Sequence, residues 1–285
     1  MAKSKAQTER ERTPPAAPMP LPIAVPDNHT HLDIVIDWVG GTAKEHLDRA
    51  EAVGIDRIVQ VGTDVESSRW AAELAATDNR VLAAVALHPN DAPRLGEGLY
   101  DAIRVIDELA AQERVRAVGE TGLDFYRTRE PAGHVAQRES FARHIDIAKR
   151  HGIALMIHDR DAHGAVFEVL AAEGAPERVV FHCFSGDAEM ARVCADNGYY
   201  MSFAGNSTFN ASAGLRAAYT VAPQELLLVE TDAPFLTPMP HRGSPNGPYL
   251  TPLTVQRMAA ERGEDLTELC RALSENSERV YGSWA

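Results

Sequence analysis

The sequence predicts an α/β fold, and within that class a (β/α)8 barrel of the TIM-barrel type. Short apolar runs alternate with longer segments of helical period, which is the pattern of repeated βα units around a parallel sheet. Eight such runs occur in the roughly 265 residues after the first 20, and this number of strands in this length matches the barrel. A doubly wound open sheet is the competing arrangement. The barrel is favoured because polar residues stand at so many predicted strand ends.

The first 20 residues differ from the rest of the chain. They are polar and rich in proline, with no apolar stretch that resembles the core of a signal peptide. The sequence therefore predicts a flexible N-terminal extension over 1–20 and a single barrel domain over 21–285.

The eight predicted strands are bounded by polar or turn-forming residues. Several of them do not alternate between apolar and polar residues, as expected when both faces of a strand are covered. The strands are expected at 23–27, 57–62, 81–87, 116–120, 153–158, 179–182, 199–203 and 226–230.

Helices are expected between these strands and at the end of the chain. The clearest runs over 131–150, where Pro131 suits the first helical position and Gly152 follows as a stop signal. Two more helical segments, 253–263 and 266–280, complete the chain.

The composition is that of an ordinary globular protein long enough to bury a large core. The chain has 285 residues, of which 45% are hydrophobic and 24% are charged. The three cysteines are an odd number, which argues against a disulfide framework and favours the reducing cytoplasm. No apolar run approaches the roughly 18 residues that a membrane span needs. No feature indicates an obligate protein partner.

Acidic residues outnumber basic ones. Lys and Arg total 28 and Asp and Glu total 41, so the formal net charge is −13. This argues against a large basic face for binding phosphates. If the substrate is an anion such as nucleic acid, positive charge must come from a few local arginines or from bound metal.

A His-x-His pair follows the first predicted strand. In extended backbone, residues i and i+2 point to the same face, so His29 and His31 can reach one metal ion together. An exposed loop pair is the alternative interpretation of this short motif.

Glu120 stands at the end of the fourth predicted strand, between two glycines. An acidic side chain in the mouth of a barrel is costly without a cation or hydrogen-bond donors. A loop carboxylate paired with Arg127 is the alternative.

Three further ligand types stand at the ends of the fifth, sixth and eighth strands, namely His158, His182 and Asp232. Three or four ligands satisfy one ion, so six converging side chains indicate two ions about 3.5 to 4 Å apart that share a carboxylate. Glu120, near the middle of the ring, is the expected bridge. The ligand types suit Zn²⁺ or Mn²⁺.

Other histidines and cysteines receive structural interpretations. Because Cys183 follows His182 directly, alternation along a strand predicts that it points to the opposite face and packs in the core. Histidines in helical segments are expected to pack or to lie at the surface; these are His46, His134, His144, His151 and His163.

Five segments occur in order over nearly the whole chain after residue 20, namely DNHTHLD (27–33), GETGLDFYR (119–127), MIHDRDA (156–162), FHCFSG (181–186) and ETDAPFLTP (230–238). Together they resemble the signatures of the TatD family of metal-dependent deoxyribonucleases. Two further segments, LHPND (87–91) and HRGSPNGP (241–248), resemble family segments as well.

The resemblance implies a TIM-barrel hydrolase that cuts phosphodiester bonds in DNA with two divalent ions, often from the 3′ end, and suggests activity with Mg²⁺. It also implies a ligand set for each ion. The first ion would be held by His29, His31, Glu120 and Asp232, and the second by Glu120, His158 and His182. Asp232 would also orient or deprotonate a bridging water. The paired ions would lower the pKa of that water from ~15.7 toward neutrality, and the hydroxide would attack phosphorus in line.

Two positions depart from the family pattern. Asn90 stands where the family often has a second histidine, and Gly247 stands where it often has a glutamate. Both positions are expected to touch substrate rather than metal, so they bear on nucleic-acid preference.

Loops after the strands supply candidate contacts to substrate. Unpaired bases are predicted to stack on Phe125, Tyr126 or Phe235, which stand beside the ligands. Contacts to phosphate are expected from His88, Arg127, Arg160, Arg242 and Asn246.

Two other functions remain open from the sequence. The same metal site could hydrolyse an ester on a transfer RNA end or a small phosphodiester. A metal-binding barrel that serves as a scaffold in DNA repair is the non-enzyme alternative, and the presence of every expected ligand argues against it.

Overall fold

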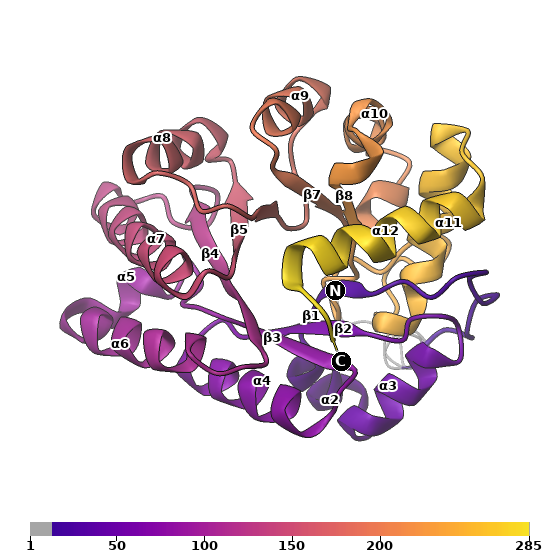
Figure 1. Cartoon of the computed structure of the whole chain (residues 1–285), viewed down its shortest axis with the longest axis horizontal. Helices are drawn as coiled ribbons and strands as arrows, with labels where there is room; N and C mark the ends of the chain where they lie inside the picture. Colours follow the sequence, from indigo (N-terminus) through magenta and orange to yellow (C-terminus); the bar gives the residue numbers. More distant parts are fainter. Residues whose placement is uncertain (1–12, 285) are drawn as a thin grey trace, which may run out of the picture.

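A computed structural model describes residues 13–284 of the chain. Eight parallel strands form one sheet in the order of the chain, and helices surround them (Figure 1). The strands are β1 (Asp27–Thr30), β2 (Ile58–Val61), β3 (Val81–Val85), β4 (Val115–Asp124), β5 (Ala154–Arg160), β6 (Val179–Phe181), β7 (Tyr200–Phe203) and β8 (Leu227–Val229).

The first and last strands meet and bring the sheet round into a barrel. A parallel bridge joins Thr30 to Ala233, and the Asn28 side-chain amide donates to the carbonyl of Val229 at 2.8 Å. The predicted (β/α)8 barrel is therefore confirmed, and the doubly wound open sheet is wrong.

Helices follow most strands and cover the outside of the barrel. They are α2 (Leu32–Val39), α3 (Ala43–Glu51), α4 (Val65–Thr77), α5 (Ala92–Leu95), α6 (Leu99–Ala110), α7 (Pro131–His151), α8 (His163–Glu173), α9 (Ala188–Asp196), α10 (Ala213–Val221), α11 (Thr251–Arg262) and α12 (Leu266–Tyr281). Short 3-10 turns lie at Gly96–Gly98, Gly205–Thr208, Gln224–Leu226 and Pro248–Leu250.

Local signals set the helix ends. α7 begins with Pro131 and ends at Gly152, which has the left-handed conformation that favours glycine at φ 62°. α3 begins with a capping box between Thr42 and Glu45. The three predicted helices are present within two residues of their expected bounds.

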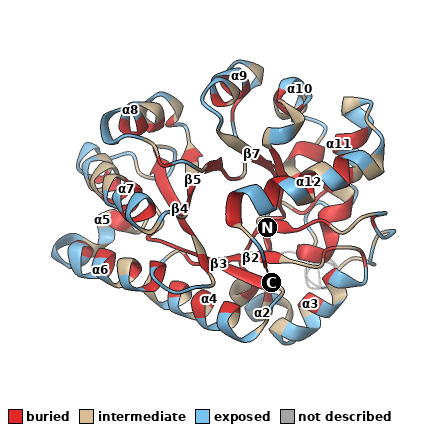
Figure 2. Ribbon diagram, viewed as in Figure 1, coloured by how far each residue is buried: buried red, intermediate tan, exposed pale blue. Residues whose placement is uncertain are grey.

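Two apolar layers stabilise the barrel, and buried residues follow the strands throughout (Figure 2). The larger layer lies between strands and helices. The smaller one fills the barrel interior and includes Val61, Leu82, Met156 and Leu228.

The C-terminal segment closes the amino end of the barrel. Trp284 is 5% exposed and belongs to the interior layer. Arg57, which precedes β2, lies over its ring at 5.4 Å, and Arg114, which precedes β4, donates to its carbonyl at 2.7 Å. This floor lies at the opposite end of the strands from the predicted ligands.

The predicted first strand is displaced. The sequence places it at 23–27, whereas β1 spans Asp27–Thr30 and so contains His29. The fourth strand is longer than predicted, so Glu120 lies within β4 and not at its end.

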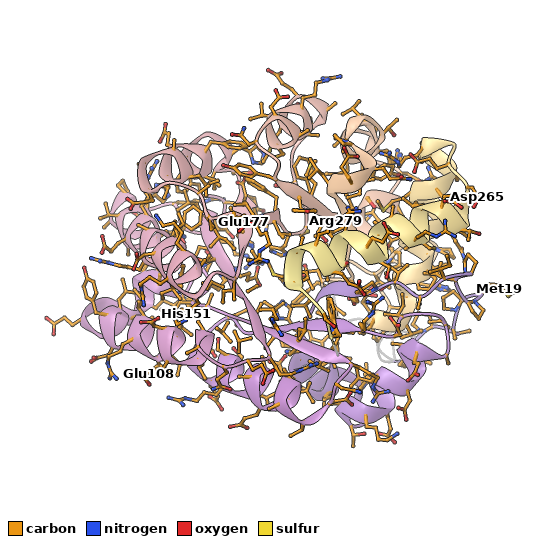
Figure 3. All side chains as sticks on the ribbon, viewed as in Figure 1. Met19, Glu108, His151, Glu177, Asp265 and Arg279 are labelled. Atoms are coloured by element: carbon orange, nitrogen blue, oxygen red, sulfur yellow. The ribbon has the colours of Figure 1, made fainter. Side chains whose placement is uncertain are left out.

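Part of the predicted N-terminal extension packs against the barrel. The carbonyl of Pro15 accepts hydrogen bonds from Arg49 at 2.5 Å and from the Tyr249 hydroxyl at 3.0 Å. Met19 projects into solvent and is 77% exposed (Figure 3). Residues 1–12 lie outside the described part of the chain. Among the described residues, no helix has the length and apolar character needed to cross a bilayer.

Candidate metal centre

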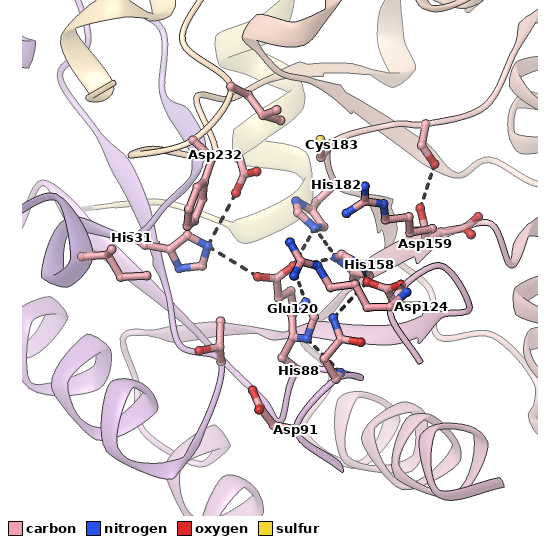
Figure 4. Close-up of a pocket in the computed structure, with 18 of the residues that line it drawn as sticks. His31, His88, Asp91, Glu120, Asp124, His158, Asp159, His182, Cys183 and Asp232 are labelled. Atoms are coloured by element: carbon pink, nitrogen blue, oxygen red, sulfur yellow. Dashed lines mark hydrogen bonds and ion pairs between the residues drawn. The ribbon is translucent and has the colours of Figure 1, made fainter. Parts of the chain in front are cut away.

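A pocket of about 650 Å³ opens at the carboxyl ends of the strands (Figure 4). Five of the six predicted ligands line it directly, and His29 lies beneath them, fully buried. The five are His31, Glu120, His158, His182 and Asp232.

One group of ligand atoms joins β1 to the segment after β8. The Nε2 atoms of His29 and His31 are 3.1 Å apart. Oδ1 of Asp232 lies 3.7 Å from His29 Nε2 and 3.6 Å from His31 Nε2. All three ligand atoms lie close enough together to hold one cation.

Glu120 stands between this group and a second one. Its Oε1 lies 3.4 Å from His31 Nε2, whereas its Oε2 lies 2.8 Å from His182 Nε2 and 3.1 Å from His158 Nδ1. The two oxygens of one carboxylate thus face two different sets of imidazoles. This is the geometry that a bridging carboxylate requires.

The donor set fits divalent cations. Four imidazoles and two carboxylates converge in a largely buried space, where unpaired charge is costly. Imidazole nitrogens only 3.1 Å apart and facing carboxylate oxygens suit a shared cation with nitrogen and oxygen ligands.

The pKa values of His31, His182 and the Glu120 carboxylate shift so that all three groups are charged. Burial opposes charge on His31, but hydrogen bonds to Asp232 and Glu120 raise its pKa to about 10. Burial opposes charge on His182 too, and the Glu120 carboxylate raises its pKa well above the usual value. Burial would raise the pKa of Glu120, but the charged His182 ring and the hydrogen bonds from His158 and His182 hold it well below the usual value. Protons on these imidazoles thus neutralise the charge of the carboxylates, and bound cations would displace these protons.

Buried acceptors fix the rings of three of the predicted ligands. His158 faces Asp124 at 3.3 Å through Nε2, and His182 faces Glu230 at 3.3 Å through Nδ1. Nδ1 of His31 lies 2.9 Å from the carbonyl of Val61. Each contact directs the other ring nitrogen toward the centre.

Sequence reasoning missed the roles of Asp124 and Glu230. Both stand inside the quoted signature segments, four residues after Glu120 and two residues before Asp232. Buried carboxylates in those segments were a signal that could have found them.

His88 lies beside the centre as a neutral ring. Its Nδ1 accepts a hydrogen bond from the backbone N–H of Asn90 at 3.0 Å, so the ring proton is on Nε2, which lies 3.8 Å from Glu120 Oε2. Burial lowers the pKa of His88 to about 3. In this tautomer the ring presents a hydrogen-bond donor to the pocket, and it also lies with Glu120 and His158 in a group of three that could hold a cation.

The predicted substrate residues divide into two sets. His88, Arg127 and Arg160 line the pocket. Arg242 and Asn246 are not brought into it: Arg242 is exposed and lies over the Phe209 ring at 4.5 Å.

Asn246 instead supports the loop after β8. It is 2% exposed, and its side-chain amide donates to the carbonyls of Thr231 at 3.0 Å and Phe235 at 2.6 Å. Its side chain is therefore used within the protein.

The expected core position of Cys183 is wrong. β6 ends at Phe181, and Cys183 has a φ of 41°, so the alternation of a strand no longer applies. The side chain lines the pocket, where Asn206 lies 3.8 Å from its sulfur. Asp232 and Leu236 also line the pocket with positive φ, at 51° and 55°. Non-glycine residues in this region carry strain that often marks a functional site.

The structural interpretation of the helical histidines is supported. Each forms a hydrogen bond with a residue outside the predicted ligand set, namely Gly40 for His46, Thr128 for His134, Thr121 for His144, Asp107 for His151 and Asp159 for His163.

The barrel and its histidine and carboxylate cluster define a metal-dependent hydrolase. Residues 26–282 match the family described as TatD related DNase, and the chain belongs to this family. The metal-dependent hydrolase TatD of Mycobacterium tuberculosis is 47% identical over 261 residues, which cover 90% of this chain and 97% of the relative. YabD of Bacillus subtilis, also a metal-dependent hydrolase, is 35% identical over 90% of this chain and 98% of the relative.

Solved structures agree with this assignment. YjjV of Escherichia coli, a TatD homologue, has a TM-score of 0.83 at 25% identity and covers 91% of this chain and 98% of its own. A TatD family hydrolase of Entamoeba histolytica, at 19% identity and a TM-score of 0.79, shares the fold over 93% of this chain and 100% of its own.

Proposed function

We propose that the protein hydrolyses phosphodiester bonds in DNA, as a 3′ to 5′ exodeoxyribonuclease that requires two divalent cations. The observation that carries the proposal is the placement of Glu120, whose two oxygens face separate ligand groups 3.4 Å and 2.8 Å away. The family description, TatD related DNase, supports DNA as the substrate.

The ligands divide between the two cations. His29, His31 and Asp232 would hold the first together with Glu120, and His158 and His182 would hold the second with the other oxygen of Glu120. When bound, the cations would activate water as a nucleophile and neutralise charge on the phosphate. Mg²⁺, Mn²⁺ and Zn²⁺ are the candidates.

The remaining residues position substrate and move protons. Asp232 is 15% exposed at the pocket surface, where its carboxylate can accept a proton from the attacking water. Arg127 and Arg160 supply local positive charge to the phosphate on a chain whose net charge is −13. The Nε2–H of the neutral His88 ring would donate a hydrogen bond to a phosphate oxygen. We place this activity in the cytoplasm because all three cysteines are free.

The test is cleavage of end-labelled DNA by metal-depleted protein reloaded with Mg²⁺, Mn²⁺ or Zn²⁺. Single-stranded DNA labelled at its 5′ end should shorten one nucleotide at a time. Asp232→Asn should reduce the rate at least about 100-fold while some metal stays bound. The matched control is Asp146→Asn, an exposed carboxylate on α7, which should leave the rate unchanged.

Two outcomes would contradict the proposal. One is negligible cleavage of DNA with both Mg²⁺ and Mn²⁺. The other is an unaffected rate in the Asp232→Asn variant. Parallel assays on mischarged transfer RNA and on small phosphodiesters then identify the alternative substrates.

A further inference from the structure

Two exposed aromatic rings lie together at the mouth of the pocket. Trp38 on α2 is 53% exposed, and Phe235, after β8, is 41% exposed. Their rings meet edge to face, with centroids 5.6 Å apart and an interplanar angle of 84°. Aromatic side chains of this size are usually buried, so a solvent-facing pair needs a reason.

The pair is continuous with the candidate metal centre. Phe235 lines the pocket, and its ring centroid lies 6.4 Å from that of His31. On α2, Ile34 lines the same pocket, and Trp38 follows four residues later on the same helix face. Ring contacts therefore lead from His31 to Phe235, both of which line the pocket, and from Phe235 to Trp38, which lies beside it.

The other two aromatic candidates near the pocket are already engaged. Phe125 stacks on His134 with centroids 3.9 Å apart, and the guanidinium of Arg160 lies 4.0 Å above the Tyr126 ring. Of the three side chains that the sequence indicated for stacking, Phe235 keeps its ring toward the pocket.

We propose that Trp38 and Phe235 form a stacking platform for one unpaired nucleobase, that of the nucleotide attached to the phosphate at the metal centre. The inference rests on the proposed function and deepens it. Aromatic rings stack on any base, because every base has a π face, so the platform would bind without regard to sequence. A base inside a duplex is covered by its neighbours, so the platform would select single-stranded ends.

The shape of the surface favours a base over a protein partner. The apolar area is a pair of rings beside the exposed Asp37 rather than a broad face. The pair also stands one ring away from His31, within reach of a nucleotide whose phosphate is bound at the candidate metal centre. Stacking on an aromatic pair needs no positive charge, which suits an acidic protein.

The test compares two substrates in Trp38→Ala and Phe235→Ala. One is single-stranded DNA, and the other is an abasic deoxyribose phosphodiester, which has neither a base nor any other aromatic ring. Affinity for a cleavage-resistant phosphorothioate strand, measured by fluorescence anisotropy on the metal-loaded protein, should fall about 5- to 100-fold in each variant. The ratio of kcat/KM on DNA to kcat/KM on the base-free diester should fall with it.

Controls separate stacking from folding. Tyr100→Ala removes an aromatic ring that is 58% exposed on α6, away from the pocket, and should change neither measurement. Trp38→Phe and Phe235→Trp, which keep a ring, should restore DNA affinity. In the unchanged chain, 2-aminopurine near the 3′ end of the strand should lose fluorescence on binding, and Trp38→Ala should reverse this.

Three results would overturn the platform. The first is unchanged DNA affinity in both alanine variants of a chain that cleaves DNA. The second is an equal loss on both substrates, which would mean that the rings only shape the pocket. The third is a concentration-dependent dimer that Trp38→Ala dissociates. If the unchanged chain cleaves the base-free diester but not DNA, the proposed function fails and the platform fails with it.

Discussion

The imidazoles of the candidate metal centre have unequal partners. His158 and His182, on the side of the second cation, face the carboxylates of Asp124 and Glu230. On the side of the first cation, His31 faces a backbone carbonyl and His29 lies 3.1 Å from the sulfur of Met156. A carboxylate partner makes an imidazole a stronger donor, so the two sites should differ in strength.

This asymmetry predicts a selective effect of two conservative substitutions. Asp124→Asn and Glu230→Gln remove charge without removing volume, and each should weaken binding of the second cation about 10- to 100-fold. The first cation should be much less affected. Calorimetric titration of the metal-depleted protein with Mn²⁺ or Zn²⁺ resolves the two events. Equal weakening of both events would contradict the assignment of these carboxylates to one site.

His144 predicts a pH dependence of stability. It is fully buried, accepts from the backbone N–H of Leu87 at 3.3 Å and lies 2.8 Å from the Thr121 hydroxyl through Nδ1. Burial lowers its pKa from 6.5 to about 3. Because the unfolded chain binds the proton more readily, the stabilising effect is full above pH 6.5 and is lost as the pH falls toward 3.

The expected size follows from proton linkage. Because His144 stays neutral in the folded protein, the free energy of unfolding should be about 1.4 kcal/mol lower at pH 5.5 than at neutral pH. Urea denaturation of the metal-depleted protein between pH 7.5 and 5.5 measures this loss. His144→Gln should show a smaller loss over the same range, and an identical loss would assign the effect to other groups.

At the scale of elements, the long strand β4 organises the centre. It supplies Glu120, the Thr121 hydroxyl beside His144, and Asp124 beside His158. β4 lies against β5 so closely that a Cβ at Gly122 would be 2.2 Å from the carbonyl oxygen of His158. Gly122 also has a φ of 133°, which other residues rarely adopt.

Gly122→Ala should therefore separate the two strands where they carry ligands. We expect weaker metal binding and a loss of stability of roughly 1–3 kcal/mol from backbone strain alone. The matched control is Gly152→Ala at the end of α7, where φ is 62° and a Cβ meets nothing within 4 Å. That variant should cost about 1–2 kcal/mol and leave metal binding intact. Unchanged metal binding in Gly122→Ala would contradict the argument.

Hydrophobic patterning predicted the barrel but misplaced β1. The first strand was predicted at 23–27 because Ile23 and Val25 are apolar, whereas pairing with β2 begins at Asp27. β1 is polar and buried because its side chains bond inside the protein, as when the Asp27 carboxylate accepts from Thr231. Patterning cannot show such a strand, because the partners that satisfy it lie some two hundred residues away.

The proposed ligands were predictable where they closed a predicted apolar strand, and their surroundings were not. The fifth, sixth and eighth predicted strands indicated His158, His182 and Asp232 through the contrast of polar with apolar residues, although β5 itself continues to Arg160. The positions of Trp38 and Asn246 depend instead on the fold. α2 brings Trp38 against Phe235, which is some 200 residues later in the chain. Hydrogen bonds within the loop after β8 turn the side-chain amide of Asn246 inward. Local sequence contains no record of those contacts.

At the scale of the whole molecule, the floor of the barrel is made by the end of the chain. Trp284→Ala should open a cavity below the interior layer and destabilise the protein by about 3–5 kcal/mol. The candidate metal centre lies at the other end of the strands, so the kcat expected on DNA under the proposed function should be unchanged well below the lowered Tm. The exposed Tyr100→Ala should shift Tm little. A lost kcat with an unshifted Tm would contradict this separation of floor and mouth.

The contact between β1 and the segment after β8 closes the barrel. The backbone N–H of Asp232 donates to His29 at 2.9 Å, and that of His31 donates to Ala233 at 2.9 Å, so the ligands proposed for the first cation stand on both sides of this joint. A cation held there would cross-link β1 to the segment after β8, which are some two hundred residues apart in the sequence. Binding of the first cation should slow amide hydrogen exchange at His31 and Asp232 more than in the other strands. Removal of the cation by a chelator should speed exchange at these two amides first.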